Sequence, residues 1–504
     1  MTKILQPDTE IDRFIRVTST DGGGLQIWVA DNQKINLKVQ NYVNRMQNAN
    51  TGKVSVSFVP LDEIGKKEQI IEASGRSQNQ KKVMTYFRKA SELNASDVHL
   101  TIGRDGSNYC YVEVRVHGEL RCIDCIDKEE GMELASTIVL SMCDVTEKQF
   151  YPNQNQDGRI AEEFVKALGI FGARYAHMPA VGGLYVVMRL IPDDSETPPT
   201  MEELGFLPEQ IKTFRSLLRR PDGMIILSGP TGSGKSTTLR CASSMYLSIW
   251  GYDEKLPRRR LLTIEDPPEG RIEGAIQTPI TADKKDTESL KRAWVLANVY
   301  AMRCDPDAIL TGEIRDRESA ESATKAALTG HLLLATLHTS DTLNIIERLE
   351  SEGVSSRLIA DPKVLTGLIS QRLVQRLCEH CKIPWNAGKQ LLLPDDVELV
   401  ENYCDIKSVY TRNIEGCKHC NKGITGRIVV SEVIAPDAKF YELYRTHSKI
   451  IARSYWHYKL GGITRNQHVI HYINNGIVDP LGAHAICPID EDSYSLLKES
   501  ELNV

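Results

Sequence analysis

Gly229-Pro-Thr-Gly-Ser-Gly-Lys-Ser236 is the stretch that decides the fold of this chain. It fits the pattern G-x-x-x-x-G-K-[ST] at every fixed position, with an apolar run before it and the helix-compatible run TTLRCASSMYLS after it. Glycines let successive backbone N–H groups turn around a phosphate, and the N-terminus of the following helix adds favourable partial charge. A chance glycine-rich turn would not need both flanks. The pattern therefore predicts a phosphate-binding loop between a strand and a helix.

This loop also predicts individual roles. Lys235 is expected to contact the β- and γ-phosphates of a nucleotide, and the Ser236 hydroxyl is expected to hold Mg²⁺. The residues expected to bind the nucleotide are Gly229, Pro230, Thr231, Gly232, Ser233, Gly234, Lys235, Ser236 and Thr237.

Short apolar runs recur around the loop, at residues 224–228, 261–264, 308–311 and 332–335, with longer helix-compatible stretches between them. One such stretch, after a candidate N-cap at Asp286, repeats apolar residues at helical spacing. Strands that alternate with helices are typical of an α/β fold, with a mostly parallel sheet and helices on both faces.

Polar residues follow three of these runs. Glu265, Glu313 and His338 come at the ends of the second, third and fourth runs. A single acid in such a place is more often a cap or part of a solvated loop. Ligands of an open parallel sheet bind at the carboxyl ends of its strands, so three successive polar strand ends favour a catalytic site. Gly312 stands directly before Glu313, where an aspartate is usual in P-loop ATPases. Mg²⁺ would therefore be held by more water ligands, or by another acid such as Asp266.

Four segments in order, GPTGSGKSTTL, TIEDPPE, MRCDPDAILTGEIRDRESA and TGHLLLATLHTSDTLNIIERL, resemble the secretion ATPases of type II secretion and type IV pilus assembly. The resemblance covers about residues 84 to 480. It implies a RecA-like P-loop ATPase domain, preceded by a smaller α+β (PAS-like) domain and a short N-terminal module. A glycine before the Walker B glutamate is normal for that family.

The resemblance assigns further roles by motif. Glu313 would orient or deprotonate the attacking water, with Glu265 as a second candidate, and His338 would sense the γ-phosphate. Arg174 and Arg189 match the positions from which family members send arginine fingers to the nucleotide, and a guanidinium suits this role because it always carries charge. Read from the residues alone, each of these arginines could equally be a surface side chain.

Cys378, Cys381, Cys417 and Cys420 form two C-x-x-C pairs, with 35 residues between them. Four thiolates in this arrangement suit a closed, structural Zn²⁺ site, and the alternative is a pair of redox dithiols. The resemblance strengthens zinc and favours filament assembly over retraction, because assembly members often carry such cysteines. A third pair, Cys122 and Cys125, has no partner pair and is interpreted as ordinary thiols.

The chain has 504 residues, and its length suggests about three domains. The expected division is a partner-binding module at 1–65, a linker at 66–82, an α+β domain at 83–191 that supplies the arginine fingers, a hinge at 192–200, an ATPase domain at 201–435 with a zinc-binding insertion at 378–420, and a helical region at 436–504.

Composition narrows the function classes. The net charge of −6, from 61 basic and 67 acidic side chains, gives no overall attraction to nucleic acid. No apolar stretch approaches the roughly 18 residues of a membrane helix, and no export signal is visible, so a cytoplasmic protein with reduced thiols is expected.

The residues, together with what the resemblance implies about activity, assembly and partners, lead to three hypotheses. The preferred one is a homohexameric, Mg²⁺-dependent ATPase that powers assembly of a type IV or conjugative thin pilus, or of a type II secretion pseudopilus. It would act at the bacterial inner membrane through a membrane platform protein. A DNA-translocating or conjugative-transfer ATPase of the same superfamily is the alternative, and a scaffold that binds ATP without turnover is the third.

Overall fold

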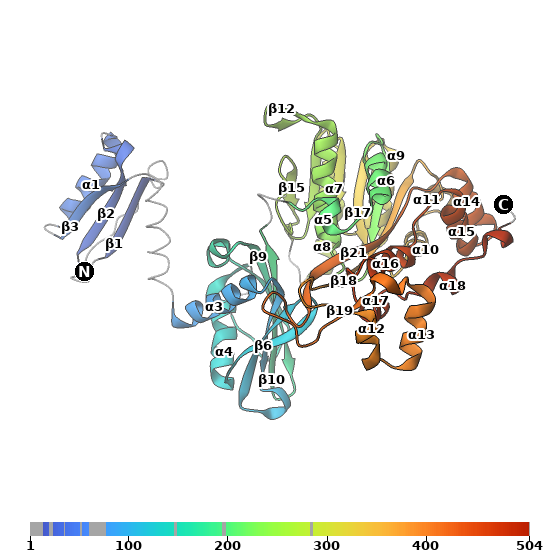
Figure 1. The fold of residues 1–504 in the computed structure, drawn as a ribbon. Coiled ribbons are helices and arrows are strands. Elements are labelled where there is room, and N and C mark those ends of the chain that lie inside the picture. The colour runs from blue at the N-terminus through green and yellow to red at the C-terminus, as the bar shows by residue number, and fades with distance from the viewer. Residues whose placement is uncertain are drawn as a thin grey trace.

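The computed structural model describes residues 14–19, 24–34, 36–50, 53–59, 77–145, 149–193, 198–282 and 286–502. Within these ranges lie three units, which Figure 1 shows from blue to red along the chain. Residues 66–76 of the expected linker and 194–197 of the expected hinge lie outside the described residues.

The first unit is a three-stranded sheet in the order β1-β2-β3, with one helix. Its elements are β1 (Ile15–Ser19), β2 (Leu25–Ala30), α1 (Leu37–Ala49) and β3 (Val54–Val59). Alternate residues of β2 are buried, as a strand with one covered face requires. Ile27 and Val29 of β2 join Tyr42 and Met46 of α1 in a core of their own. The short N-terminal module that the resemblance implies is therefore a three-stranded sheet packed against one helix.

The second unit is an antiparallel sheet in the order β6-β5-β4-β10-β9-β8-β7. Its elements are α3 (Gln78–Glu92), β4 (Ala95–Ile102), β5 (Tyr109–Val116), β6 (Glu119–Asp127), α4 (Lys128–Thr137), β7 (Cys143–Val145), β8 (Gln156–Ile160), β9 (Ile170–Ala180) and β10 (Gly183–Pro192). Helix α3 begins inside the stretch expected to be a linker. Ser77 and Gln80, which lie in that stretch, form a capping box at the start of the helix.

The third unit contains the phosphate-binding motif and a seven-stranded sheet in the order β15-β14-β16-β17-β11-β18-β21. Its strands are β11 (Gly223–Ser228), β14 (Leu261–Glu265), β15 (Ile276–Pro279), β16 (Ala308–Thr311), β17 (Leu332–Leu337), β18 (Leu365–Leu377) and β21 (Ile424–Ile434). All neighbouring strands are parallel except β18 and β21. The four predicted runs are the strands β11, β14, β16 and β17.

Helices cover both faces of this sheet, as predicted (Figure 1). Met224 and Ile226 of β11 belong to one hydrophobic core, whereas Ile225 and Leu227 belong to the core on the opposite face. The helices are α5 (Met201–Leu204), α6 (Pro208–Leu218), α7 (Lys235–Trp250), α8 (Thr287–Ala301), α9 (Arg317–Leu328), α10 (Asn344–Ser351) and α11 (Ser356–Ile359). Asp286 caps α8, since its carboxylate accepts hydrogen bonds from the N–H groups of Glu288 and Ser289.

The cysteine-rich segment is an insertion between β18 and β21. It contains α12 (Trp385–Gly388) and α13 (Pro394–Tyr403), and a two-stranded sheet of β19 (Ile383–Pro384) and β20 (Tyr410–Thr411). Since β18 and β21 are neighbours in the sheet, the insertion leaves and returns at the same place. Five helices follow β21: α14 (Ala438–Thr446), α15 (Lys449–Lys459), α16 (Arg465–Asn474), α17 (Pro480–His484) and α18 (Glu491–Ser495).

The second unit touches the insertion through the β5–β6 turn. Arg412 donates from both terminal nitrogens to the Glu119 carboxylate, and this guanidinium lowers the pKa of Glu119. Gln375 of β18 donates to the His117 carbonyl at 2.9 Å. These contacts join residues of the second and third units that are more than 250 positions apart in the sequence.

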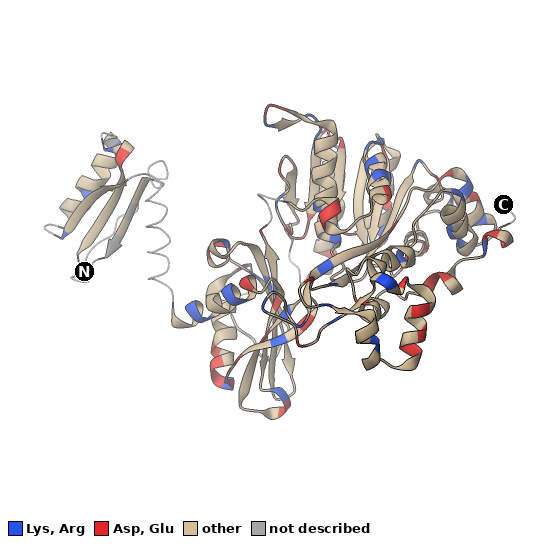
Figure 2. Cartoon of the chain, viewed as in Figure 1, with Lys and Arg blue, Asp and Glu red and all other residues tan. Residues whose placement is uncertain are grey.

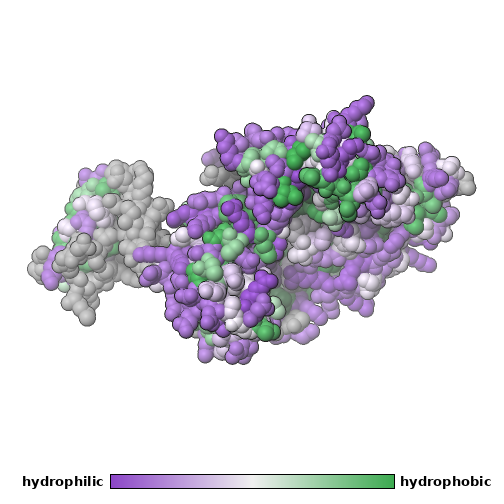
Figure 3. Space-filling model, turned by 60° about the horizontal axis from the view of Figure 1, so that its bottom comes forward, coloured by the Kyte–Doolittle hydropathy of each residue, from purple (hydrophilic) through white to green (hydrophobic). Residues whose placement is uncertain are grey.

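Charges of both signs are interspersed along the ribbon in Figure 2. On the face drawn in Figure 3, apolar residues form small groups separated by hydrophilic ones. Among the described residues, no helix is both long enough and apolar enough to cross a membrane.

Candidate functional site

The phosphate-binding motif forms the turn between β11 and α7, at the carboxyl edge of the parallel sheet. Gly229, Gly232 and Gly234 all have positive φ angles, of 150°, 79° and 85°. At Gly229 a side chain is also excluded by space, because a Cβ would come within 2.5 Å of the Gln371 carbonyl oxygen. The glycines of the motif thus provide a backbone path that other residues rarely adopt.

Lys235 is the first residue of α7, and its side chain turns back over the loop. The ammonium donates to the carbonyls of Gly229 at 2.7 Å and Pro230 at 3.1 Å. Burial lowers the pKa of Lys235 to about 8, against the opposing influence of Glu313 and Glu269. A desolvated cation in a glycine-rich cradle at a helix N-terminus fits a phosphate ligand.

Glu313 lies at the centre of the polar groups on this edge. Its carboxylate accepts a hydrogen bond from Arg315 Nε at 2.8 Å, and its other oxygen is 3.4 Å from His338 Nε2. Burial lowers the pKa of His338, and Lys235 and Arg315 lower it further, whereas Glu313 raises it. The phosphate-binding loop and the ends of β16 and β17 therefore lie at the same edge of the sheet.

Backbone contacts fix the turn that carries Glu313. Gly312 N–H donates to the Ile264 carbonyl at 2.9 Å, and the Thr336 hydroxyl donates to the Gly312 carbonyl at 2.6 Å. A Cβ at position 312 would lie 3.3 Å from the Ile264 oxygen. The glycine before Glu313 thus sits where a larger side chain would be crowded.

Glu265, the last residue of β14, lies deeper than Glu313. It is 9% exposed, and one of its carboxylate oxygens accepts hydrogen bonds from the Thr263 hydroxyl at 2.6 Å and from Gln277 Nε2 at 3.1 Å. The carboxylate is therefore held in place by neutral donors of its own sheet.

Arg174 and Arg189 are directly opposite each other on β9 and β10. Arg174 reaches the loop after β14, where it donates to the Asp266 carbonyl at 3.2 Å and pairs with Glu269 at 3.0 Å. Arg189 instead pairs with Asp97 of β4, with its Nε 3.2 Å from the carboxylate. In this chain Arg174 is brought to the edge of the site and Arg189 stays within its own sheet.

Two further polar residues, His331 and Gln371, lie in or next to strands of this sheet. His331 precedes β17, at the opposite end of that strand from His338, and its Nδ1 is 3.3 Å from the Ala326 carbonyl at the end of α9. Gln371 of β18 was not indicated by any motif, yet its amide donates to the Ser233 carbonyl within the loop at 2.7 Å. A lone glutamine in an apolar strand carries no sequence signal, so only the fold reveals this contact.

The four cysteines Cys378, Cys381, Cys417 and Cys420 converge at the base of the insertion. One potential ligand atom from each lies within 4.8 Å of all the others. This is the only group of three or more potential metal ligands found among the described residues.

The donors around these thiols fit a thiolate-bound metal. Backbone N–H groups of Cys417 and Gly423 point at the Cys420 sulfur, at 3.1 and 3.2 Å. Burial opposes ionisation of Cys420, but these hydrogen bonds lower the pKa of the thiol to about 7. Four converging sulfurs with N–H···S contacts are compatible with tetrahedral Zn²⁺. The exposed pair Cys122 and Cys125 lies on β6 of the second unit and does not belong to this group.

Comparisons with known proteins agree with this geometry. A family model described as "Type II/IV secretion system protein" matches residues 72–479. Type II secretion system ATPase E of Vibrio cholerae is 32% identical over 396 residues, which cover 78% of this chain and 72% of that protein. Type IV pilus assembly ATPase PilB of Thermus thermophilus is 34% identical over 363 residues, but these cover 72% of this chain and only 38% of PilB.

Solved structures show the same fold. The pilus retraction motor PilT with bound ADP superposes with a TM-score of 0.53 at 24% identity, over 81% of this chain and 97% of PilT. The ATPase DotB of Legionella pneumophila gives a TM-score of 0.52 at 20% identity, over 80% of this chain and 94% of DotB.

Proposed function

Because this chain belongs to the family of type II/IV secretion system proteins, we propose that it is a motor subunit that hydrolyses ATP to drive assembly of a type IV or conjugative thin pilus, or of a type II secretion pseudopilus. The identity to an ATPase over most of the chain supports the enzymatic activity. The cysteine group, together with the likeness to PilB, supports assembly as the work that is done.

Nucleotide binding is assigned to residues 229–237. The backbone of the loop and Lys235 would hold the phosphates, and the ammonium would exchange its bonds to the Gly229 and Pro230 carbonyls for phosphate oxygens. The Ser236 hydroxyl would hold Mg²⁺, which offsets phosphate charge when it is bound.

Glu313 is proposed to orient the attacking water and accept its proton. It is more accessible than Glu265, and it lies beside His338, the proposed sensor of the γ-phosphate. Glu265 is less suited to proton transfer, because Thr263 and Gln277 already donate to its buried carboxylate. We assign Glu265 to holding the loop after β14, which contains Asp266 and Glu269.

Arg174 and Arg189 are proposed as the arginine fingers that offset charge in the transition state. Arg174 supports this role because it already contacts the loop after β14. Arg189 would have to exchange its bond to Asp97 for the nucleotide, by a movement of its sheet relative to the ATPase sheet. Coupling of hydrolysis to such a movement is how the chain would do mechanical work.

The assembly in which this occurs is proposed to be a homohexameric ring at the cytoplasmic side of the inner membrane. The ring would act on a membrane platform protein, with residues 1–65 as the binding module, and structural zinc would hold the insertion at 378–420. Nucleic acid is not expected as a partner, given the mixed surface charge.

One observation carries the proposal: Lys235, Glu313 and His338 come together at the carboxyl edge of the parallel sheet. We expect the variant Lys235→Ala to lose ATP turnover, measured as phosphate release by the purified chain, because the loop loses its buried cation. Lys255→Ala, in the exposed loop after α7, is the control and should keep wild-type turnover. Turnover that survives in Lys235→Ala would remove this loop from the mechanism.

A further inference from the structure

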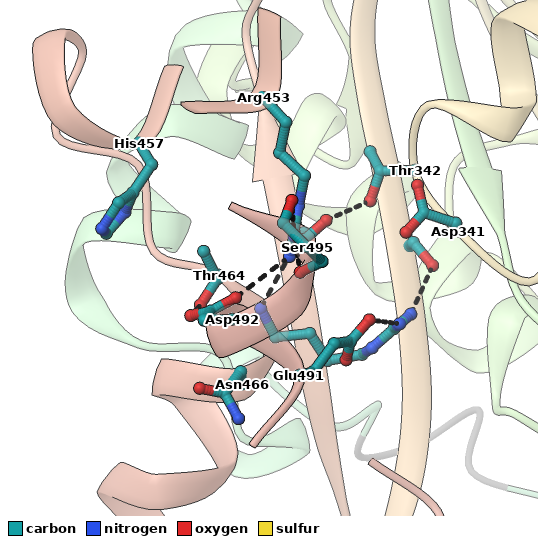
Figure 4. A network of polar contacts seen from close by, with 12 residues as sticks. Asp341, Thr342, Arg453, His457, Thr464, Asn466, Glu491, Asp492 and Ser495 are labelled. Atoms are coloured by element: carbon teal, nitrogen blue, oxygen red, sulfur yellow. Dashed lines mark hydrogen bonds and ion pairs between the residues drawn. The ribbon is translucent and has the colours of Figure 1, made fainter. Parts of the chain in front are cut away.

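A cluster of buried charged residues contacts the loop that follows β17 (Figure 4). At its centre is Glu432 of β21, which is 1% exposed. Its carboxylate accepts hydrogen bonds from Arg453 Nε at 3.2 Å, from the backbone N–H of Arg465 at 3.2 Å and from the Thr342 hydroxyl at 2.7 Å. Although burial opposes ionisation, Arg453 and Arg465 hold the pKa of Glu432 at about 2. The Glu432 carboxylate is therefore ionised at neutral pH.

Arg465, the first residue of α16, connects this cluster to the loop that follows His338. Its Nη1 donates to the Ser340 carbonyl at 3.1 Å, and its Nη2 pairs with Glu491 at 2.9 Å. A second arginine, Arg372 of β18, donates to the same Ser340 carbonyl at 3.3 Å. Two guanidinium groups thus hold one backbone oxygen, two residues beyond the proposed γ-phosphate sensor.

The neighbouring residues of β18 extend the connection to the phosphate-binding loop. The Ser370 hydroxyl accepts a hydrogen bond from Arg465 Nη1 at 3.4 Å, and Gln371 donates to the Ser233 carbonyl at 2.7 Å. Three consecutive residues, 370 to 372, therefore contact the charge cluster, the phosphate-binding loop and the loop after His338.

Residues 486–495, named here the C-terminal segment, also contact the cluster. Arg453 donates to the Ser495 hydroxyl at 2.6 Å and lies 3.4 Å from the Asp492 carboxylate. Arg372 donates to the Ile486 carbonyl at 3.2 Å. Figure 4 shows Arg453 of α15 next to Asp492 and Ser495 of α18, with Thr342 of the loop after β17 on the other side.

Buried ion pairs are weak sources of stability, since desolvation offsets most of their attraction. This cluster nevertheless removes several charged groups from water, with Arg453 and Arg465 each 4% exposed as side chains. Its effect is to fix the loop of residues 338–343, which makes charge-assisted hydrogen bonds with side chains of β18, β21 and α16.

We propose that this charge cluster, made of Glu432, Arg453, Arg465, Glu491 and Asp492, positions His338 for its response to the γ-phosphate. Arg465 is the positioning residue that acts directly, through the Ser340 carbonyl. The C-terminal segment then belongs to the hydrolytic machinery, although it contributes no group to the nucleotide. This inference rests on the proposed function, because it presupposes that His338 acts in ATP hydrolysis.

The test is a double-mutant cycle between Arg465→Ala and His338→Ala. We expect Arg465→Ala to lower kcat by about tenfold to a hundredfold, because a catalytic group displaced by about 1 Å loses that much. The affinity for ADP should change little, since Gln371 and Lys235 still hold the phosphate-binding loop. Adding Arg465→Ala to His338→Ala should cause almost no further fall in kcat, because both changes remove the same function, the action of His338 on the γ-phosphate. Arg465→Lys should recover part of the rate.

The matched control is Gln210→Ala. Gln210 is also buried and donates to the Ser431 carbonyl at 2.8 Å, so it holds α6 against β21 without contacting a residue of the cluster. It should lower the melting temperature yet keep wild-type kcat. Additive losses in the cycle, or an equal fall of kcat in Gln210→Ala, would show that Arg465 acts only through folding.

A binding measurement separates this inference from the proposed function. The ratio of affinities for a non-hydrolysable ATP analogue and for ADP reports recognition of the γ-phosphate without turnover. Arg465→Ala should reduce that ratio as far as His338→Ala does. A wild-type chain that does not hydrolyse ATP would overturn the proposed function, whereas a ratio unchanged in Arg465→Ala would overturn this inference alone.

Discussion

At the scale of single residues, the site depends on a few polar groups whose positions are set by strand ends. Glu313 contacts both Arg315 and His338, and it reaches His338 because β16 and β17 are neighbouring parallel strands. Parallel strands of one sheet bring their carboxyl ends to the same edge, so residues about 25 positions apart meet there.

Glu313→Gln is expected to keep nucleotide binding and to lower turnover by about a hundredfold or more, since an amide cannot accept the proton of water. Phosphate release and the affinity for ADP measure the two effects. Glu265→Gln is the comparison, and it should cost less, because the Glu265 carboxylate already accepts bonds from Thr263 and Gln277. A larger loss in Glu265→Gln would exchange the roles of the two acids.

Arg174→Ala and Arg189→Ala are each expected to lower turnover on the order of a thousandfold if they serve as arginine fingers. The control is Arg121→Ala, an exposed arginine on β6 of the same sheet, which should have little effect. Steady-state phosphate release checks all three. If Arg189→Ala behaves like the control, its bond to Asp97 is structural and only Arg174 reaches the nucleotide.

At the scale of elements, α16 docks against β21 through a neutral histidine. His468 Nδ1 accepts the N–H of Ser431 at 3.1 Å, and its Nε2 donates to the Gly205 carbonyl at 3.1 Å. Burial lowers the pKa of His468 to about 4. This arrangement needs the neutral ring, because a charged ring would place a second donor against the Ser431 N–H.

The chain is therefore expected to lose stability as the pH falls from about 6.5 towards 4. Over this range the unfolded state binds a proton that folded His468 does not, so acid favours unfolding, by at most about 3 kcal/mol from this residue. Melting temperatures at pH 7 and pH 4.5 measure the effect. His468→Gln should be less stable at pH 7 but should show a smaller fall between the two values. An unchanged pH dependence in that variant would assign the effect to other groups.

The insertion between β18 and β21 is expected to carry about one zinc per chain. Cys420→Ser should lose the metal and make residues 378–423 sensitive to proteases, because this small element depends on its cross-link. Metal analysis and limited proteolysis are the measurements. Cys122→Ser is the control and should retain zinc, whereas carefully reduced wild-type protein without zinc would contradict the interpretation.

At the scale of the whole molecule, the first unit has a hydrophobic core of its own, separate from the cores of the two larger units. The contacts between the second unit and the ATPase sheet, such as Arg412 with Glu119 and Arg174 with Glu269, do not involve the first unit. This separation supports the proposal that the first unit binds a partner while the other two units hydrolyse ATP.

A shortened chain of residues 77–504 should keep its melting temperature, zinc content and ATP turnover, but lose association with inner-membrane vesicles that contain the platform protein. Sedimentation with such vesicles measures the loss. Full-length Lys235→Ala should show the reverse, with binding but no turnover. Vesicle binding by the shortened chain would move the docking surface to another part of the molecule.

Much of this protein could be predicted from short stretches of its sequence. The phosphate-binding loop, the four central strands, the α/β class and the family resemblance all followed from local patterns, and the fold and the comparisons confirm the class and the family. Local patterns suffice there because strand formation, helix capping and a glycine backbone path depend on neighbouring residues.

The tertiary structure decided what no local pattern carries. It placed Gln371 against the phosphate-binding loop, separated the environments of Arg174 and Arg189, and gathered Glu432, Arg453 and Arg465 behind the loop after His338. Each of these contacts joins residues from different elements, and the sequence neighbours of a buried glutamine or arginine do not reveal its partner. The stretch 229–236 determined by itself where phosphate would bind, whereas strand order and packing decided which distant side chains surround it, because these alone set distances across the sheet.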